Sequence, residues 1–140
     1  MRQTMLEEQV KEVLQNYQLK NEKAITFGHP KVKMNWILPL PGVTVTSFDQ
    51  FQPFFVYFDE SGISFFPLDM NQNYRVIGRS FLAWNDMDHF QFKKGLLEDE
   101  IQIQLQDQKM VMKLVKKKAM NSWIKENNEY LIQNHHFYQS

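Results

Sequence analysis

The sequence predicts an α+β, mainly β domain with a bent antiparallel sheet, or partly open barrel, of about seven strands. A C-terminal helix caps this sheet, and an extra N-terminal helix precedes it. Two observations predict the class. Apolar residues recur at helical spacing near both ends of the chain, and aromatic or alternating runs fill the middle. Aromatic residues make up 14% of the 140 residues, which favours pleated, half-buried surfaces.

The first predicted element is an amphipathic helix over residues 4–20. Thr4 and Glu7 have the spacing of a capping box. The apolar stripe is a possible interface, which packs either on its own sheet or on a second copy in a symmetric dimer. Residues 1–22 carry this helix, and residues 23–140 complete the same structural domain. The stripe consists of Leu6, Val10, Val13, Leu14 and Tyr17.

Two hairpins are predicted in the middle of the chain. The first pairs Phe54–Phe58 with residues 63–66 around a turn in which Gly62 takes a positive φ. The second pairs the alternating residues 101–105 with residues 110–114, around a turn at 107–108. Further extended segments are expected at 25–38, 75–84 and 90–92. Residues 39–53 are expected to form a loop, in which residues 43–46 pair briefly, and His29 is expected in a loop before Pro30.

The last predicted element is a helix with Met120, Trp123, Ile124 and Leu131 on one stripe, interrupted by the polar Asn127. A lone amphipathic helix after a run of strands can cover an end of the sheet that would otherwise expose the core. We therefore expect Trp123 to be largely buried against the sheet.

The order of these elements resembles that of bacterial pleckstrin-homology-like (PH-like) domains. The resemblance runs from about residue 23 to residue 133, and its most telling segment is Phe81-Leu82-Ala83-Trp84-Asn85-Asp86-Met87-Asp88-His89-Phe90, followed by a turn at Gly95. It implies a bent sheet plugged by the C-terminal helix. The helix at 4–20 and the long loop 39–53 depart from the family. Residues 38–49 contain no basic residue and one acid, so the inositide-binding mode of eukaryotic members is not expected.

Composition restricts the function further. Sixteen basic and sixteen acidic residues cancel at pH 7, so a nucleic-acid partner is not expected. The chain has no Cys, which excludes disulfides and thiolate sites. The first twenty residues lack the apolar run of a signal peptide, and no apolar run of membrane-spanning length occurs. The cytoplasm is the expected compartment.

A basic run crosses from the last strand toward the C-terminal helix. It contains Lys113, Lys116, Lys117 and Lys118. It is either a contact for anionic lipid or a solvated strand edge, where lysine discourages edge-to-edge pairing.

A second cluster consists of Asp86, Asp88 and His89. These side chains could hold a metal ion, completed by His135 and His136, or could shape a turn between strands.

The expected function is a non-catalytic interaction module without a cofactor, which binds a protein or peptide or assembles with itself. Two alternatives are a module that binds anionic membranes at their surface and a metal-dependent hydrolase around Asp86, Asp88 and His89. No hydrolase or phosphate-binding motif accompanies the second alternative.

Overall fold

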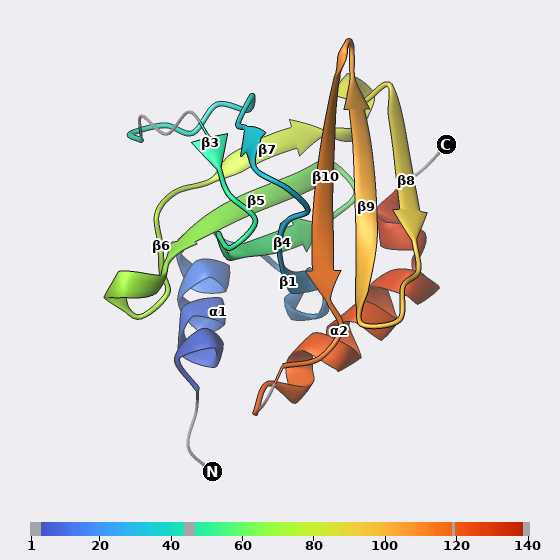
Figure 1. The fold of residues 1–140 in the computed structure, drawn as a ribbon. Helices are drawn as coiled ribbons and strands as arrows, with labels where there is room; N and C mark the ends of the chain where they lie inside the picture. The colour runs from blue at the N-terminus through green and yellow to red at the C-terminus, as the bar shows by residue number, and fades with distance from the viewer. Residues whose placement is uncertain (1–3, 44–46, 119, 139–140) are drawn as a thin grey trace.

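The structure, a computed structural model, describes residues 4–43, 47–118 and 120–138, and these confirm the predicted α+β class (Figure 1). The helices are α1 (Met5–Asn16) and α2 (Ser122–Gln133). The strands are β1 (Ile25–Pro30), β2 (Met34–Asn35), β3 (Ser47–Phe48), β4 (Phe54–Phe58), β5 (Gly62–Asp69), β6 (Arg75–Val76), β7 (Ser80–Ala83), β8 (His89–Lys93), β9 (Glu98–Leu105) and β10 (Gln108–Val115).

Eight of these strands form one antiparallel sheet, and seven of them follow the order β6, β5, β4, β1, β10, β9, β8. The eighth, β7, pairs with the first half of β5, and β6 pairs with its end. β2 and β3 pair separately. β1 joins the two halves of the chain, because it pairs with β4 on one side and with β10 on the other. In Figure 1, β8, β9 and β10 stand nearly upright while β4 and β5 lie across the view, so the sheet bends sharply near β1.

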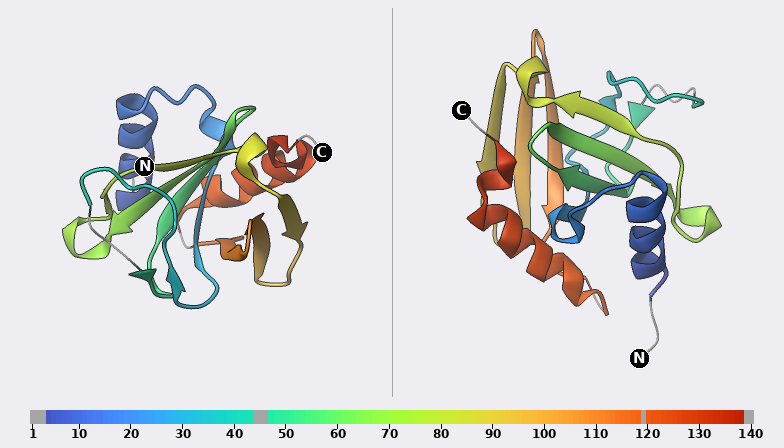
Figure 2. Two further views of the ribbon diagram at one scale, coloured as in Figure 1. Left: turned by 90° about the horizontal axis from the view of Figure 1, so that it is seen from above. Right: turned by 180° about the vertical axis from the view of Figure 1, so that it is seen from behind.

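α1 contacts one face of the bent sheet, whereas α2 contacts both faces, because its Trp123 meets Phe55 on the face that carries Phe66. Successive residues of a strand point to opposite faces, and Phe55 pairs with Phe66, whereas Val56 pairs with Thr26. Tyr17, just after α1, packs edge-on against Phe66 with ring centroids 5.0 Å apart. Asn128 of α2 contacts Thr26 on the other face. The view from behind in Figure 2 shows α2 running along the β8–β10 side and α1 beside β5.

Both predicted hairpins are present. β4 pairs with β5 from Phe58↔Ile63 to Phe54↔Pro67, and β9 pairs with β10 over eight residues. Gly62 has a φ of 158°, which is positive, as predicted, and close to extended backbone. Space also requires glycine there, because a Cβ would lie 2.1 Å from the carbonyl oxygen of Leu82 on β7.

Aromatic side chains fill the core on the face of β4 that carries Phe54. Trp36 stacks on Phe54 at 5.1 Å and meets Phe65 and Phe48 edge-on at 5.6 and 5.2 Å. The indole Nε1 donates a hydrogen bond to the Ser80 hydroxyl at 2.9 Å, which satisfies its polar atom inside the core. Trp36 and Phe48 therefore anchor β2 and β3 on the core.

Four local predictions need correction, and a fifth falls mostly outside the described residues. Met120 precedes α2 and is 79% exposed, so it does not belong to the buried stripe, and Trp123 is only partly buried. The second hairpin turns at residues 106–107, one residue earlier than predicted. His29 lies within β1, which ends at Pro30, and not in a loop. The pairing expected for residues 43–46 falls mostly on 44–46, which lie outside the described residues, and the pairing seen is at Ser47–Phe48.

Candidate functional site

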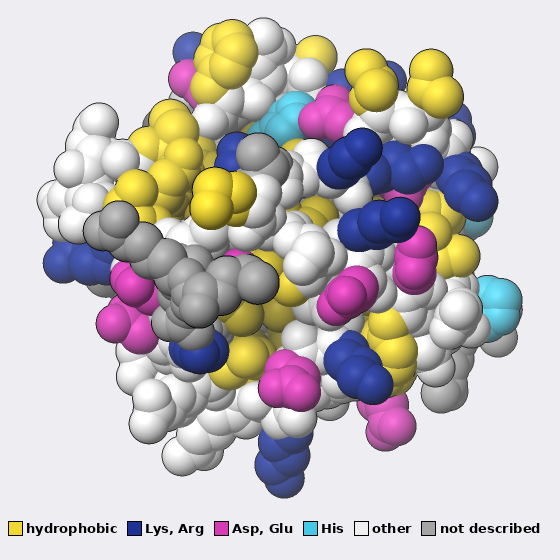
Figure 3. Space-filling view, turned by 90° about the horizontal axis from the view of Figure 1, so that it is seen from below, with side chains coloured by type: hydrophobic (Ala, Val, Ile, Leu, Met, Phe, Trp, Pro, Cys, Tyr) yellow, Lys and Arg dark blue, Asp and Glu magenta, His cyan; other side chains and the backbone are white. Residues whose placement is uncertain are grey.

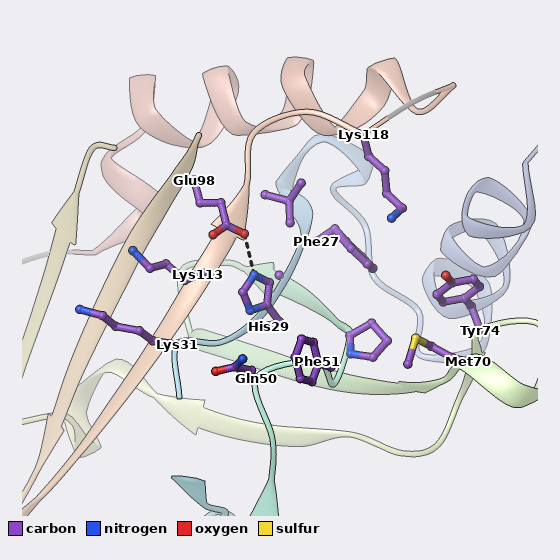
Figure 4. A pocket seen from close by; sticks show the side chains of 13 residues that line it. Phe27, His29, Lys31, Gln50, Phe51, Met70, Tyr74, Glu98, Lys113 and Lys118 are labelled. Carbon is purple, nitrogen blue, oxygen red and sulfur yellow. Dashed lines mark hydrogen bonds and ion pairs between the residues drawn. The ribbon is translucent and has the colours of Figure 1, made fainter. Parts of the chain in front are cut away.

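A groove of about 530 Å³ opens where β1, β9 and β10 meet the connection before β4. On the face of the molecule seen from below, a histidine lies next to an acidic side chain, between hydrophobic side chains and a group of basic ones (Figure 3). Figure 4 shows the groove, with His29 at its centre, Phe51 and Met70 on one side, and Lys31 and Lys113 on the other. The groove therefore combines an apolar wall with a charged one.

A histidine–carboxylate pair forms the centre of the groove. Nε2 of His29 lies 2.6 Å from Oε2 of Glu98, and Nδ1 lies 2.8 Å from the carbonyl oxygen of Pro30. Both partners are acceptors when Glu98 is ionised, so both contacts are hydrogen bonds when both ring nitrogens carry protons. β1 and β9 lie on either side of β10, so the two side chains reach each other across that strand. The two contacts fix the orientation of the imidazole.

A second carboxylate lies on the same face of the neighbouring strands. Oε1 of Glu100 is 3.2 Å from Nζ of Lys31 and 3.2 Å from Nζ of Lys113, and the Gln102 amide donates to Oε2. The Gln102 hydrogen bond, aided by the two lysines, lowers the pKa of Glu100 to about 2 against the opposing effect of burial. Glu100 therefore stays ionised at neutral pH and is matched by two cations.

Lys118 differs from these paired lysines. Its Nζ lies 5.3 Å from the centroid of the Phe27 ring, a cation–π contact at the edge of the groove. No acidic group of the described residues lies within ion-pair distance of it. Beside it, Figure 4 shows Phe51, Met70 and Tyr74 facing the same space. Phe51 is 70% exposed, so a large apolar surface remains open to a ligand.

The predicted basic run is divided between different surroundings. Lys113 pairs with Glu100, whereas Lys116 lies 3.8 Å from Asp99 and donates to the carbonyl oxygen of Gly95 at 2.8 Å. Lys117 is exposed, and Lys118 lies at the groove. The four lysines therefore do not form one uniform contact surface.

The predicted metal ligands are also dispersed. No set of three His, Cys, Asp or Glu side chains in the described part of the chain lies close enough to hold a metal ion. Asp88 accepts a hydrogen bond from the backbone N–H of Gln106 at 2.5 Å, which fits the turn interpretation. Asp86, His89 and His135 are exposed, whereas His136 is buried against Phe92.

The apolar stripe of α1 is largely covered by its own domain. Leu6 and Val13 are buried, and Val10 and Tyr17 pack against the core. Leu14 is half-buried and, with Val10, lines a shallow groove between α1 and the start of α2. A partner would therefore find little of the stripe beyond Val10 and Leu14.

Sequence reasoning did not identify the groove. The period-two alternation of Phe27, His29 and Lys31 was the available signal, because it puts these three side chains on one face of an extended strand. The partner carboxylate Glu98 is 69 residues away in sequence, and no local pattern connects it to His29.

The chain was compared with family models, curated proteins and solved structures, and it matches none of them. No helix in residues 4–43, 47–118 or 120–138 has the length and apolarity needed to cross a membrane.

Proposed function

We propose that this chain is a non-catalytic interaction module that binds a protein segment in the His29–Lys118 groove. The ligand we propose is an extended peptide with an acidic side chain next to an apolar one. The observation that carries the proposal is Lys118, which lies over Phe27 without an acidic partner among the described residues.

The charges of the groove favour an acidic ligand. Glu100 is paired with Lys31 and Lys113, and Glu98 lies within hydrogen-bond distance of His29, so each acid of this region already has a partner. A ligand carboxylate at Lys118 would form a charge-assisted bond at the edge of an apolar surface, where such bonds are stronger than in open water.

The apolar wall supplies the second half of the recognition. Phe51 and Met70 are both exposed and face the groove. Covering a large apolar side chain fully contributes about 1.5–3 kcal/mol, and exposed aromatic residues often anchor interfaces. A peptide side chain that lies between Phe51 and Met70 would remove this surface from water.

The arrangement of His29 supports binding rather than catalysis. Both ring nitrogens are already occupied, by Glu98 and by the Pro30 carbonyl, so the ring has no position left for a substrate proton. We also propose a PH-like fold, supported by the antiparallel path from β7 through β5, β4, β1, β10 and β9 to β8, with α2 packed on it. The proposed compartment is the cytoplasm.

The test uses a library of random nine-residue peptides displayed on phage and selected on the immobilised full chain. Enriched peptides are synthesised, and their Kd values are measured by fluorescence polarisation. We expect enriched peptides to pair Asp or Glu with an apolar residue. Lys118→Glu should raise the Kd of these peptides about tenfold or more, which is about 1.4 kcal/mol of binding free energy. Phe51→Ser should also raise their Kd.

The matched control is Lys117→Glu, which makes the same charge change one residue away, outside the groove lining. It should leave Kd unchanged. Circular dichroism checks that each variant is folded. The proposal is wrong if no peptide is enriched, or if enriched peptides bind the Lys118→Glu and Lys117→Glu variants equally well.

A further inference from the structure

A second surface lies at the turn between β8 and β9. Leu96 is 92% exposed and Leu97 is 81% exposed, although both are large aliphatic residues. Neither belongs to the hydrophobic core or to the partly buried residues packed against it. Internal packing therefore gives no reason for two adjacent leucines at this position.

The turn that carries these leucines is held in place by polar contacts. The buried Asp99 accepts a hydrogen bond from the Gly95 N–H at 2.9 Å, and Nζ of Lys116 donates to the Gly95 carbonyl at 2.8 Å. Lys116 follows β10, so this contact brings the end of β10 next to the β8–β9 turn. Leu96 and Leu97 are thus presented from a fixed base.

The charge around the turn is positive after internal pairing is counted. Lys93, Lys94 and Lys117 are exposed, and none of them has an acidic partner within ion-pair distance among the described residues. The acids that begin β9 are engaged elsewhere, Glu98 by His29 and Asp99 by Lys116. Figure 3 shows basic side chains gathered on one side of the face seen from below, beside protruding hydrophobic ones.

We propose that this surface docks on an anionic lipid bilayer, with Leu96 and Leu97 inserted at the interface and Lys93, Lys94 and Lys117 against the headgroups. Two exposed aliphatic side chains surrounded by lysines match such an interface, where apolar insertion and charge attraction add together. Neither the apolar insertion nor the charge attraction is strong enough by itself to hold the chain on the bilayer. This function is separate from peptide binding in the groove, and it uses only Lys117 of the lysine run.

The test is co-sedimentation of the full chain with phosphatidylcholine vesicles prepared with and without phosphatidylserine. We expect binding to the phosphatidylserine vesicles at low salt, weaker binding at high salt, and little binding to phosphatidylcholine alone. The Leu96→Ser/Leu97→Ser variant should lose most of this binding. The affinity of the Lys93→Glu/Lys94→Glu variant for phosphatidylserine vesicles should fall about fivefold or more for each lysine replaced.

Two control variants remove an exposed hydrophobic side chain and reverse a lysine charge away from the turn. The first is Phe81→Ser, on β7. The second is Lys109→Glu, near the tip of the β9–β10 hairpin and at the opposite end of β10 from Lys116 (Figure 1). Both should bind vesicles like the unaltered chain. Absence of binding to phosphatidylserine vesicles, or equal binding by the turn variants and the controls, would overturn the proposal. A dimer seen by light scattering that the double serine variant dissociates, without vesicle binding, would instead assign the surface to a second copy.

Discussion

The hydroxyl of Thr26 on β1 donates a 2.6 Å hydrogen bond to Oδ1 of Asn128 on α2, which lies 102 residues further along the chain. The Asn128 amide in turn donates to the carbonyl oxygen of Val115 at 2.7 Å. The preceding Asn127 donates to the carbonyl oxygens of Glu22 and Ile25 at 3.0 and 2.8 Å. Two asparagines thus fasten α2 to one end of the β1–β10 pairing, where β1 begins and β10 ends.

We predict that Asn128→Ala lowers the free energy of unfolding by about 2–4 kcal/mol, because it leaves the buried Thr26 hydroxyl and the Val115 carbonyl without partners. Urea denaturation followed by fluorescence measures the change. Glu129→Ala, at the next and exposed position, should change stability by less than about 0.5 kcal/mol. Equal effects of the two substitutions would show that the asparagine contacts do not stabilise the fold.

At the start of α2, Ile124 rather than Trp123 is the side chain that packs fully into the core. Ile124 is fully buried, whereas Trp123 is partly exposed and meets Phe55 edge-on at 6.1 Å. We predict that Ile124→Ala costs about 2–5 kcal/mol and that Trp123→Ala costs less. Thermal and urea unfolding of both variants would measure the order. A larger loss for Trp123→Ala would mean that the start of α2 packs more closely on the sheet than the structure shows.

Acid should destabilise the fold through His136. Burial among aromatic rings, with Phe92 at 4.5 Å and Phe58 at 5.1 Å, lowers the pKa of His136 from 6.5 to about 4, and the nearby His135 contributes a smaller lowering. The unfolded chain therefore takes up this proton near pH 6.5 while the folded chain does not. We predict that stability falls by about 2–3 kcal/mol as pH falls from 6.5 to about 4.

His136→Asn should remove this fall, and we choose Asn because it tolerates the left-handed backbone at this position, where φ is 54°. The exposed His135→Asn serves as the control and should keep most of the pH dependence. Urea unfolding at several pH values between 4 and 7 measures the slope. If the His136→Asn variant has the same slope as the unaltered chain, other groups cause the acid sensitivity.

Local patterns predicted those parts of the fold that depend on neighbours in sequence. Thr4 caps α1 through a 3.1 Å hydrogen bond from the Glu7 N–H, as the capping spacing indicated. The runs on either side of Gly62 pair in the predicted hairpin. In both cases residues a few positions apart satisfy one another, so periodicity and turn chemistry suffice.

The same reasoning was correct for Ile124 and Leu131 of α2 but wrong for other positions, because burial in a helix depends on what lies opposite. Asn127 interrupts the apolar stripe in sequence, yet it is buried and binds the backbone at the start of β1. Met120 fits the stripe, yet it precedes the helix and is exposed. A polar side chain is stable in the core when it meets unpaired carbonyl groups, and the sequence does not show where those groups lie.

The sequence alone determined the α+β fold class of this protein, the approximate positions of its helices and two hairpins, and the side of α1 that is buried. Only the tertiary structure decided which distant side chains meet: His29 with Glu98, Lys31 and Lys113 with Glu100, and Lys118 with Phe27. It also decided that Leu96 and Leu97 remain in solvent. The physical reason is that side-chain alternation fixes the face on which a residue lies, whereas strand order fixes its neighbours, and strand order is set by packing across the whole chain.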